Sequence, residues 1–143
     1  MVMNHSRHMW RSWKSRRSWE KAAKHNIVSA KNNLAYLLSE GLGVKQDQPR
    51  AAALWLEAAE SGHAEAQVHL GNALFYGFGV PKDQVRGLAW ILSASKAAVT
   101  TPEPGGGPEV LKMAQDDQDN MVKSSPEILE QARSLEGRLR TQR

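Results

Sequence analysis

Eighteen residues of this chain return, in recognisable form, after an interval of 36 residues. The segment AKNNLAYLLSEGLGVKQD, residues 30–47, is matched by AQVHLGNALFYGFGVPKD, residues 66–83. A fixed interval of this length is typical of repeat proteins, in which similar supersecondary units stack on one another. Because stacked units generally present an extended surface, we expect a binding protein and not an enzyme with a closed catalytic pocket.

The positions that both copies share indicate the structure of each unit. Leucines four residues apart form one apolar stripe at helical spacing, so each copy begins with a helix, which we call helix A. Two glycines separated by one residue then predict a sharp reversal of the chain. The aspartate that follows is placed to cap the first turn of a second helix, helix B. The shared pairs are Leu34 and Leu70, Leu38 and Leu74, Gly41 and Gly77, Gly43 and Gly79, and Asp47 and Asp83.

This arrangement resembles the Sel-1-like repeat, an α/α solenoid unit related to the tetratricopeptide repeat. The second copy carries the LG, GFGV and KD elements of that family and a tryptophan in helix B, Trp90. The first copy has Ala35 where the family prefers glycine, and Gly87 replaces a helix B alanine in the second copy. The resemblance implies a right-handed α/α solenoid of about two and a half repeats that binds partner proteins, with helix A of each unit on the concave side.

Both ends of the repeat region predict further helices. Residues 19–30 align with residues 55–66, so a helix B without its helix A precedes the first repeat. We expect residues 1–29 to form a basic helical cap, although they also fit the interior of a longer array. Repeats then occupy residues 30–63 and 64–98, and the prolines and glycines of residues 99–108 predict a flexible loop. Residues 109–143 are expected to form C-terminal capping helices, from Glu109 to about Val122 and again after Pro126, which completes a single domain.

Composition narrows the possible functions. The chain has no cysteine, which excludes disulfides and thiolate chemistry. No segment approaches the ~20 consecutive apolar residues of a membrane helix, and the N-terminal residues lack the pattern of a signal peptide. We therefore expect a cytoplasmic protein, or a periplasmic or secreted one if an export signal has been removed.

Positive charge is concentrated at the N-terminus. Residues 1–31 hold eight lysines or arginines and one glutamate, against 11 basic and 14 acidic residues in the remainder. Tryptophans lie between these charges, so this segment resembles a basic aromatic arm that binds phosphates and stacks on bases. A charged face on a terminal helix is more often simply solvated, and we rank binding to nucleic acid or an acidic surface below binding to a protein. The candidate polyanion-binding residues are Arg11, Lys14, Arg16 and Arg17.

No cluster of residues predicts catalysis or metal binding. His5 and His8 could share a metal on one helical face, but no third ligand completes the site. Asp116, Asp117 and Asp119 lack the glycine and the closing glutamate of a calcium loop. The run of three glycines precedes no lysine of a phosphate-binding loop, and no serine has the surroundings of a catalytic nucleophile. We expect no enzyme activity, no metal and no cofactor.

The surface of helix A is the predicted site for a protein or peptide partner. Polar and aromatic residues off the leucine stripe share one helical face, at spacings of three and four residues. Two tyrosines with amide groups between them suit an extended peptide or a partner helix. We expect an adaptor, scaffold or regulator, and the alternative is an immunity-type inhibitor of a specific toxin. The predicted surface comprises Asn33, Tyr36 and Glu40 in the first copy and His69, Asn72 and Tyr76 in the second.

Overall fold

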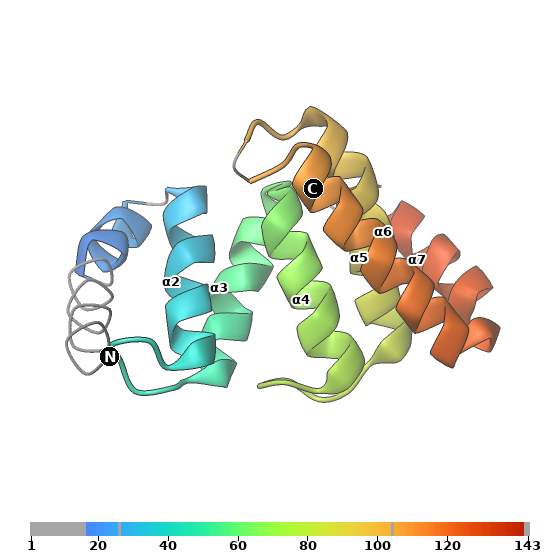
Figure 1. The fold of residues 1–143 in the computed structure, drawn as a ribbon, viewed down its shortest axis with the longest axis horizontal. Helices are drawn as coiled ribbons and strands as arrows, with labels where there is room; N and C mark the ends of the chain where they lie inside the picture. Colours follow the sequence, from blue (N-terminus) through green and yellow to red (C-terminus); the bar gives the residue numbers. More distant parts are fainter. Residues whose placement is uncertain (1–16, 26, 104, 142–143) are drawn as a thin grey trace, which may run out of the picture.

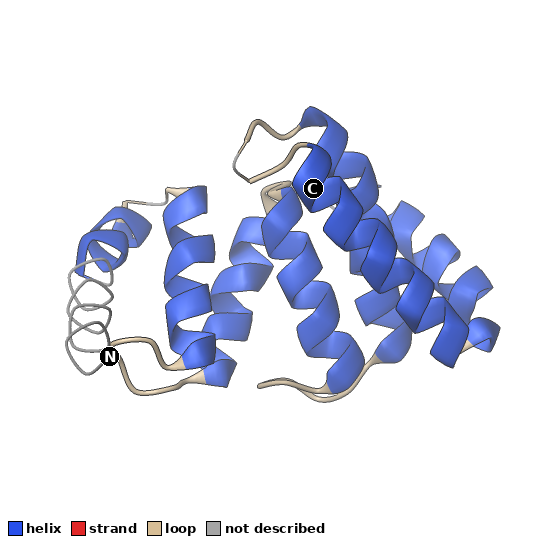
Figure 2. Ribbon diagram, viewed as in Figure 1, coloured by secondary structure: helices blue, strands red, loops and turns tan. Residues whose placement is uncertain are grey.

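The structure, a computed structural model, describes residues 17–25, 27–103 and 105–141. Within these ranges every regular element is a helix (Figure 2). A short helix occupies residues 17–24, and the other helices succeed it across the molecule in chain order (Figure 1). They are α2 (Val28–Glu40), α3 (Gln48–Glu60), α4 (Ala64–Tyr76), α5 (Gln84–Thr100), α6 (Pro108–Ser124), the 3₁₀ helix η1 (Pro126–Ile128) and α7 (Leu129–Thr141).

Neighbouring helices pack in pairs along the chain. Helix α2 packs against α3, α3 against α4, and α4 against α5. The pairs α2–α3 and α4–α5 correspond to the two copies of the repeat, and both α6 and α7 pack against α5. The predicted all-helical solenoid is therefore confirmed, with a third helical pair beyond the second repeat.

The helix boundaries follow from the capping residues that the two copies share. The Oδ1 atom of Asp47 accepts a hydrogen bond of 3.1 Å from the backbone N–H of Arg50 at the start of α3. Asp83 makes the same 3.1 Å bond with the backbone N–H of Arg86 at the start of α5. These aspartates satisfy amide groups that have no partner within the first helical turn, so helix B begins where the sequence predicts.

The glycine loop of the second repeat also contacts the first repeat. Gly79 has a φ of +77°, which favours glycine over any residue with a Cβ atom. A Cβ atom added to Gly79 would lie 2.4 Å from the carbonyl carbon of Gln48 and 2.5 Å from its oxygen. The loop before α5 therefore packs directly on the first turn of α3, and this close approach depends on the missing side chain.

A second close approach joins α4 to α5 and explains the glycine in helix B. A Cβ atom on Gly87 would lie 2.6 Å from the backbone nitrogen of Phe75 and 2.7 Å from the carbonyl oxygen of Gly71. Glycine weakens a helix by about 0.5–1 kcal/mol relative to alanine. Gly87 nevertheless allows the two helices of the second repeat to approach more closely than alanine would.

The segment between α5 and α6 differs from the predicted loop. Helix α5 continues through Thr100, so the prediction that irregular structure begins at Val99 was wrong. The loop is attached to its surroundings by hydrogen bonds, in which the Glu65 backbone N–H donates to the Gly105 carbonyl at 2.9 Å and the Gly107 N–H donates to Ala98 at 2.8 Å. Gly105 and Gly106 are buried. This segment covers the N-terminal end of α4.

The core runs the length of the described chain. Its largest fully buried apolar side chains come from α2, α4, α5 and α6 and belong to Leu34, Val68, Leu88, Ile91 and Met121. Trp19 and Ala23 of the short helix pack against the same core, as the alignment with helix B predicts. None of the described helices combines the length and the apolar character that a membrane span requires.

Candidate protein-interaction surface

The six predicted surface residues lie on the two A helices, α2 and α4. Tyr36 and Tyr76 are the most accessible aromatic residues among them, with 46% and 49% of their surface exposed. Glu40 is also exposed, whereas Asn33, His69 and Asn72 are half-buried. Because exposed aromatic side chains are a common source of interface energy, the two tyrosines are the strongest candidates of the six.

Tyr36 belongs to a column of rings that crosses from one repeat to the next. Its ring centroid lies 6.3 Å from that of His69, with the planes tilted by 39°. His69 in turn stacks on Trp55 of α3, at 5.0 Å and 22°. Trp55 is buried, so the column rests on the core and presents Tyr36 at its outer end. The sequence predicted that the two helix A faces lie side by side, but it gave no sign that Trp55 supports the ring of His69.

Tyr76 belongs to a separate cluster at the C-terminal end of α4. Its ring stacks on Phe78 at a centroid distance of 5.8 Å and meets Phe75 edge-on at 4.9 Å. Phe78 is half exposed, whereas Phe75 is buried. Sequence reasoning missed Phe78 because it lies between the two loop glycines, at a position that we interpreted only as part of a turn. The sequence did hold one signal for this residue: Phe78 is aromatic, whereas the equivalent residue of the first copy is Leu42.

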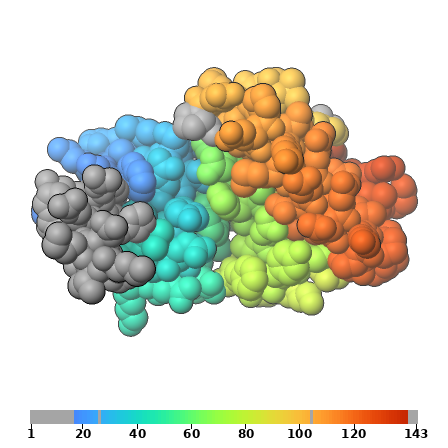
Figure 3. All heavy atoms as spheres, in the orientation of Figure 1, coloured from blue at the N-terminus to red at the C-terminus, as the bar shows by residue number. Residues whose placement is uncertain are grey.

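Asn72 is turned towards the third helical pair. Its amide nitrogen donates to the Asp117 carboxylate of α6 at 2.9 Å and to the Val68 carbonyl at 3.0 Å. Helix α6, orange in Figure 3, lies along one flank of the green surface of α4. The Asn72 amide, which was expected to meet a partner, is therefore already engaged within the chain.

A polar cluster adjoins the column of rings at His69. The Glu65 carboxylate lies 3.4 Å from Nε2 of His69, one helical turn away. The hydrogen bond with His69 holds the pKa of Glu65 below its usual value; the charges of His69 and His63 and a hydrogen bond from Asn32 act in the same direction, and burial opposes them. Asn32 is a buried residue of α2, so this cluster links the two repeats through polar contacts.

His63 caps α4 through its side chain and lies under the loop that precedes α6. Its Nδ1 atom accepts a hydrogen bond of 3.2 Å from the backbone N–H of Ala66. A Cβ atom on Gly105 would lie 2.3 Å from its Nε2 atom, so the loop backbone passes directly over the ring. Burial lowers the pKa of His63, the charge of His69 acts in the same direction, and Glu65 opposes both.

This geometry predicts a loss of stability in mild acid. Because the pKa of His63 is lower in the folded chain than the usual 6.5, the unfolded chain binds this proton first as the pH falls. The free energy of unfolding should therefore decrease below pH ~6.5, and the lowered pKa of Glu65 should extend that decrease below pH ~4.5. Protonated Nδ1 cannot accept the Ala66 amide, so the cap is lost when His63 is charged.

The test is urea unfolding across this pH range for His63→Asn, which retains a capping side chain but does not titrate. We expect a shallower pH dependence in this variant than in the parent chain. Equal slopes in the variant and the parent chain would contradict the assignment.

The structure adds little support for the predicted polyanion-binding and metal-binding residues. Five of these residues lie outside the described residues: Arg11, Lys14, Arg16, His5 and His8. Arg17 is an exposed residue within the described part of the first helix. Asp116 and Asp119 are exposed on α6, whereas Asp117 is bonded to Asn72. Within residues 17–25, 27–103 and 105–141, no three potential metal ligands of the His, Cys, Asp and Glu types gather at one point.

Comparison with known families agrees with the repeat boundaries seen in the helices. A model of the Sel1 repeat matches residues 28–63 and 64–99, together half of the chain. The chain is a member of the Sel1 repeat family. Sel1 repeats generally serve as protein–protein interaction modules.

Two solved structures resemble this Sel1 repeat chain. The first is c5321, described as a protective antigen present in uropathogenic Escherichia coli strains, which displays the same solenoid fold. The two share 30% sequence identity with a TM-score of 0.75, over 89% of this chain and 25% of c5321. This chain therefore spans a quarter of that protein's length, and the likeness confirms the right-handed α/α solenoid.

The second is a Sel1 repeat protein from Oxalobacter formigenes, with 30% identity and a TM-score of 0.49. That match covers 64% of this chain and 42% of the other. A search of curated proteins found no significant match.

Proposed function

We propose that this Sel1 repeat protein is a non-enzymatic interaction module that binds a partner protein or peptide on the surface of its A helices. The observation that carries the proposal is the pair of half-exposed tyrosines, Tyr36 and Tyr76, each held in place by neighbouring rings. A held aromatic ring loses little conformational entropy when it binds, so it contributes favourably to an interface. Asn33, Glu40 and His69 supply polar groups around the tyrosines, and Phe78 extends the apolar area at one end.

The arrangement favours a partner that is long enough to contact both ring clusters. Tyr36 and Tyr76 belong to different helices and to separate clusters, one resting on Trp55 and the other beside Phe78. An extended peptide or a helix of the partner can contact both clusters, whereas a small metabolite cannot. The proposed role is that of an adaptor or scaffold.

The test begins with the identification of the partner, by affinity capture from the native organism and mass spectrometry. With that partner in hand, Tyr36→Ala and Tyr76→Ala should each weaken binding by more than about 1 kcal/mol, because each removes an aromatic anchor. Thermal stability should change little, since both rings are half exposed. The measurement is isothermal titration of the two variants against the parent chain.

The matched control is Val99→Ala, which shortens an exposed apolar side chain on α5, a B helix. It should bind like the parent. Unchanged affinity in a Tyr36→Ala, Tyr76→Ala double variant would move the binding site to another face of the solenoid.

A further inference from the structure

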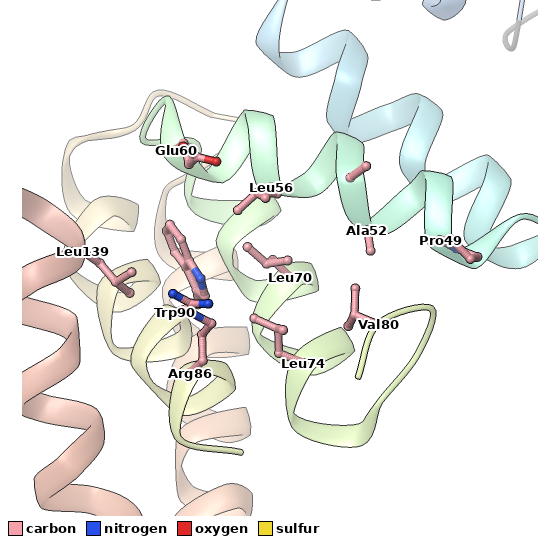
Figure 4. Close-up of a pocket in the computed structure, with 11 residues that line it drawn as sticks. Pro49, Ala52, Leu56, Glu60, Leu70, Leu74, Val80, Arg86, Trp90 and Leu139 are labelled. Atoms are coloured by element: carbon pink, nitrogen blue, oxygen red, sulfur yellow. The ribbon is translucent and has the colours of Figure 1, made fainter. Parts of the chain in front are cut away.

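A groove opens between the two B helices, on a part of the molecule that the proposed function does not use. Helices α3 and α5 both pack on α4, and the space of about 530 Å³ that remains between them is bordered at one end by α7 (Figure 4). Buried Leu70 and Trp90 form its floor, and half-exposed Leu56 forms its rim. The side chains of Leu56, Leu74 and Leu139 are directed into this space from three different helices.

The first repeat provides an internal comparison for this groove. There Arg50, at the start of α3, pairs with Glu20 of the preceding short helix, with 3.4 Å between its Nη1 atom and Oε1. Under the shift of 36 residues, Arg86 takes the place of Arg50 and Leu56 takes the place of Glu20. The carboxylate that neutralises the first arginine is therefore replaced by an apolar side chain at the second.

Arg86 is left as a cation at the edge of an apolar groove. Its side chain is exposed, lines the groove beside Trp90, and forms no ion pair with any of the described residues. At the end of α3, Glu60 lines the same groove and is a carboxylate. The groove thus favours an occupant with a negative charge near Arg86 and none near Glu60.

We propose that this groove is a second docking site, for a helical segment of a partner protein that presents apolar side chains and one carboxylate. The carboxylate pairs with Arg86, as Glu20 pairs with Arg50, and the apolar side chains contact Leu56, Leu74 and Trp90. The volume lies within the usual range of binding pockets, about 300–1,000 Å³, and accommodates side chains from one face of a helix. This proposal is independent of the binding site on the A helices.

The probe is a display library of helix-forming peptides of about 15 residues, with apolar residues fixed on one face and the flanking positions varied. Selection uses the full chain, and the Leu56→Glu chain serves for counter-selection. We expect retained peptides to carry Asp or Glu at one fixed position beside the apolar face. A selected peptide should bind about tenfold more tightly than its Glu→Gln counterpart, and Arg86→Gln should remove this preference.

Leu56→Glu gives a sharper test because it restores the ion pair of the first repeat. The new carboxylate should pair with Arg86 and weaken binding of the selected peptide by about tenfold or more, while circular dichroism and thermal unfolding remain those of the parent. Arg50→Gln, the matched change in the first repeat, should leave peptide affinity unaltered.

Several results would overturn the proposal. One is a selection that recovers no peptides or shows no preference for an acidic residue. Another is equal affinity of the selected peptide for the parent and Leu56→Glu chains. Sedimentation velocity supplies the third, since a dimer that Leu56→Glu dissociates would assign the groove to a second copy of this chain.

Discussion

Replacing Gly79 with alanine should lower the free energy of unfolding by more than about 2 kcal/mol, because two costs add at this residue. Its φ of +77° is unfavourable for any residue with a Cβ atom. The new methyl group would also lie 2.4 Å from the backbone carbon of Gln48, which the first turn of α3 holds in place. The loop or the helix must move, and the contact between the two repeats is weakened. Urea unfolding measures the loss.

Gly77→Ala is the matched control because it separates the two costs. Gly77 has nearly the same backbone angle, with φ +79°, but a Cβ atom there would lie no closer than 3.3 Å to its nearest neighbour, the Cβ of Lys82. The backbone strain remains but the contact is much milder, so Gly77→Ala should cost at least about 1 kcal/mol less than Gly79→Ala. Equal losses in the two variants would show that the loop does not pack tightly on α3.

Leu70→Ala should lower the free energy of unfolding by about 2–5 kcal/mol, the range for removing a large apolar side chain from a core. Leu70 is only 3% exposed and packs in the continuous core beneath α3 and α5. Leu56→Ala removes the same atoms beside the same groove, but Leu56 is 42% exposed. Leu56→Ala should therefore lower the free energy of unfolding by less than about 1 kcal/mol. A similar loss at both positions would contradict the placement of Leu70 in the core.

The order of the helices could be predicted from the sequence because the information for each boundary is local. Two copies of one pattern place a leucine stripe, a glycine turn and a capping aspartate at fixed offsets. The capping aspartates of this pattern, Asp47 and Asp83, each make a hydrogen bond of 3.1 Å at the start of helix B. The repetition strengthens this prediction. Residues that the repeat structure requires are the same in both copies, whereas the other residues differ.

The contacts of the third helical pair could not be predicted, since they join residues far apart in the chain. Asn72 and Asp117 are 45 residues apart, and no repeat pattern relates α6 to α4. The groove likewise needs Leu139 of α7 at one end, which only the packing of the complete fold provides. The extension of α5 through Thr100 was missed because nearby prolines and glycines dominated the local signal.

The candidate surface was partly predictable from the repeat pattern. Adjacent repeats bring equivalent helices together, so the predicted faces of the two A helices were expected to lie side by side. In the structure the rings of Tyr36 and His69, which are not equivalent positions of the repeat, lie 6.3 Å apart. The support from Trp55 was not expected, because nothing in the repeat pattern relates this helix B residue to the surface of helix A. Trp55 is buried and also stacks on His69.

Two separate docking surfaces would favour an adaptor over an inhibitor of a single toxin. The A helices present Tyr36 and Tyr76, whereas the groove lies between the B helices at Leu56 and Arg86. Partners bound at these two places need not compete, so the chain could hold both at once. An inhibitor needs only one of them.

The most direct test of the central claim is a map of chemical shift changes in the NMR spectrum of this 143-residue chain as its captured partner is added. Binding on the A helices predicts that the largest changes fall on Tyr36, His69, Tyr76 and Phe78. Residues at the far end of α7 should be unaffected by the partner. Changes confined to the groove between α3 and α5, or to the short helix at residues 17–24, would contradict binding of this partner on the A helices.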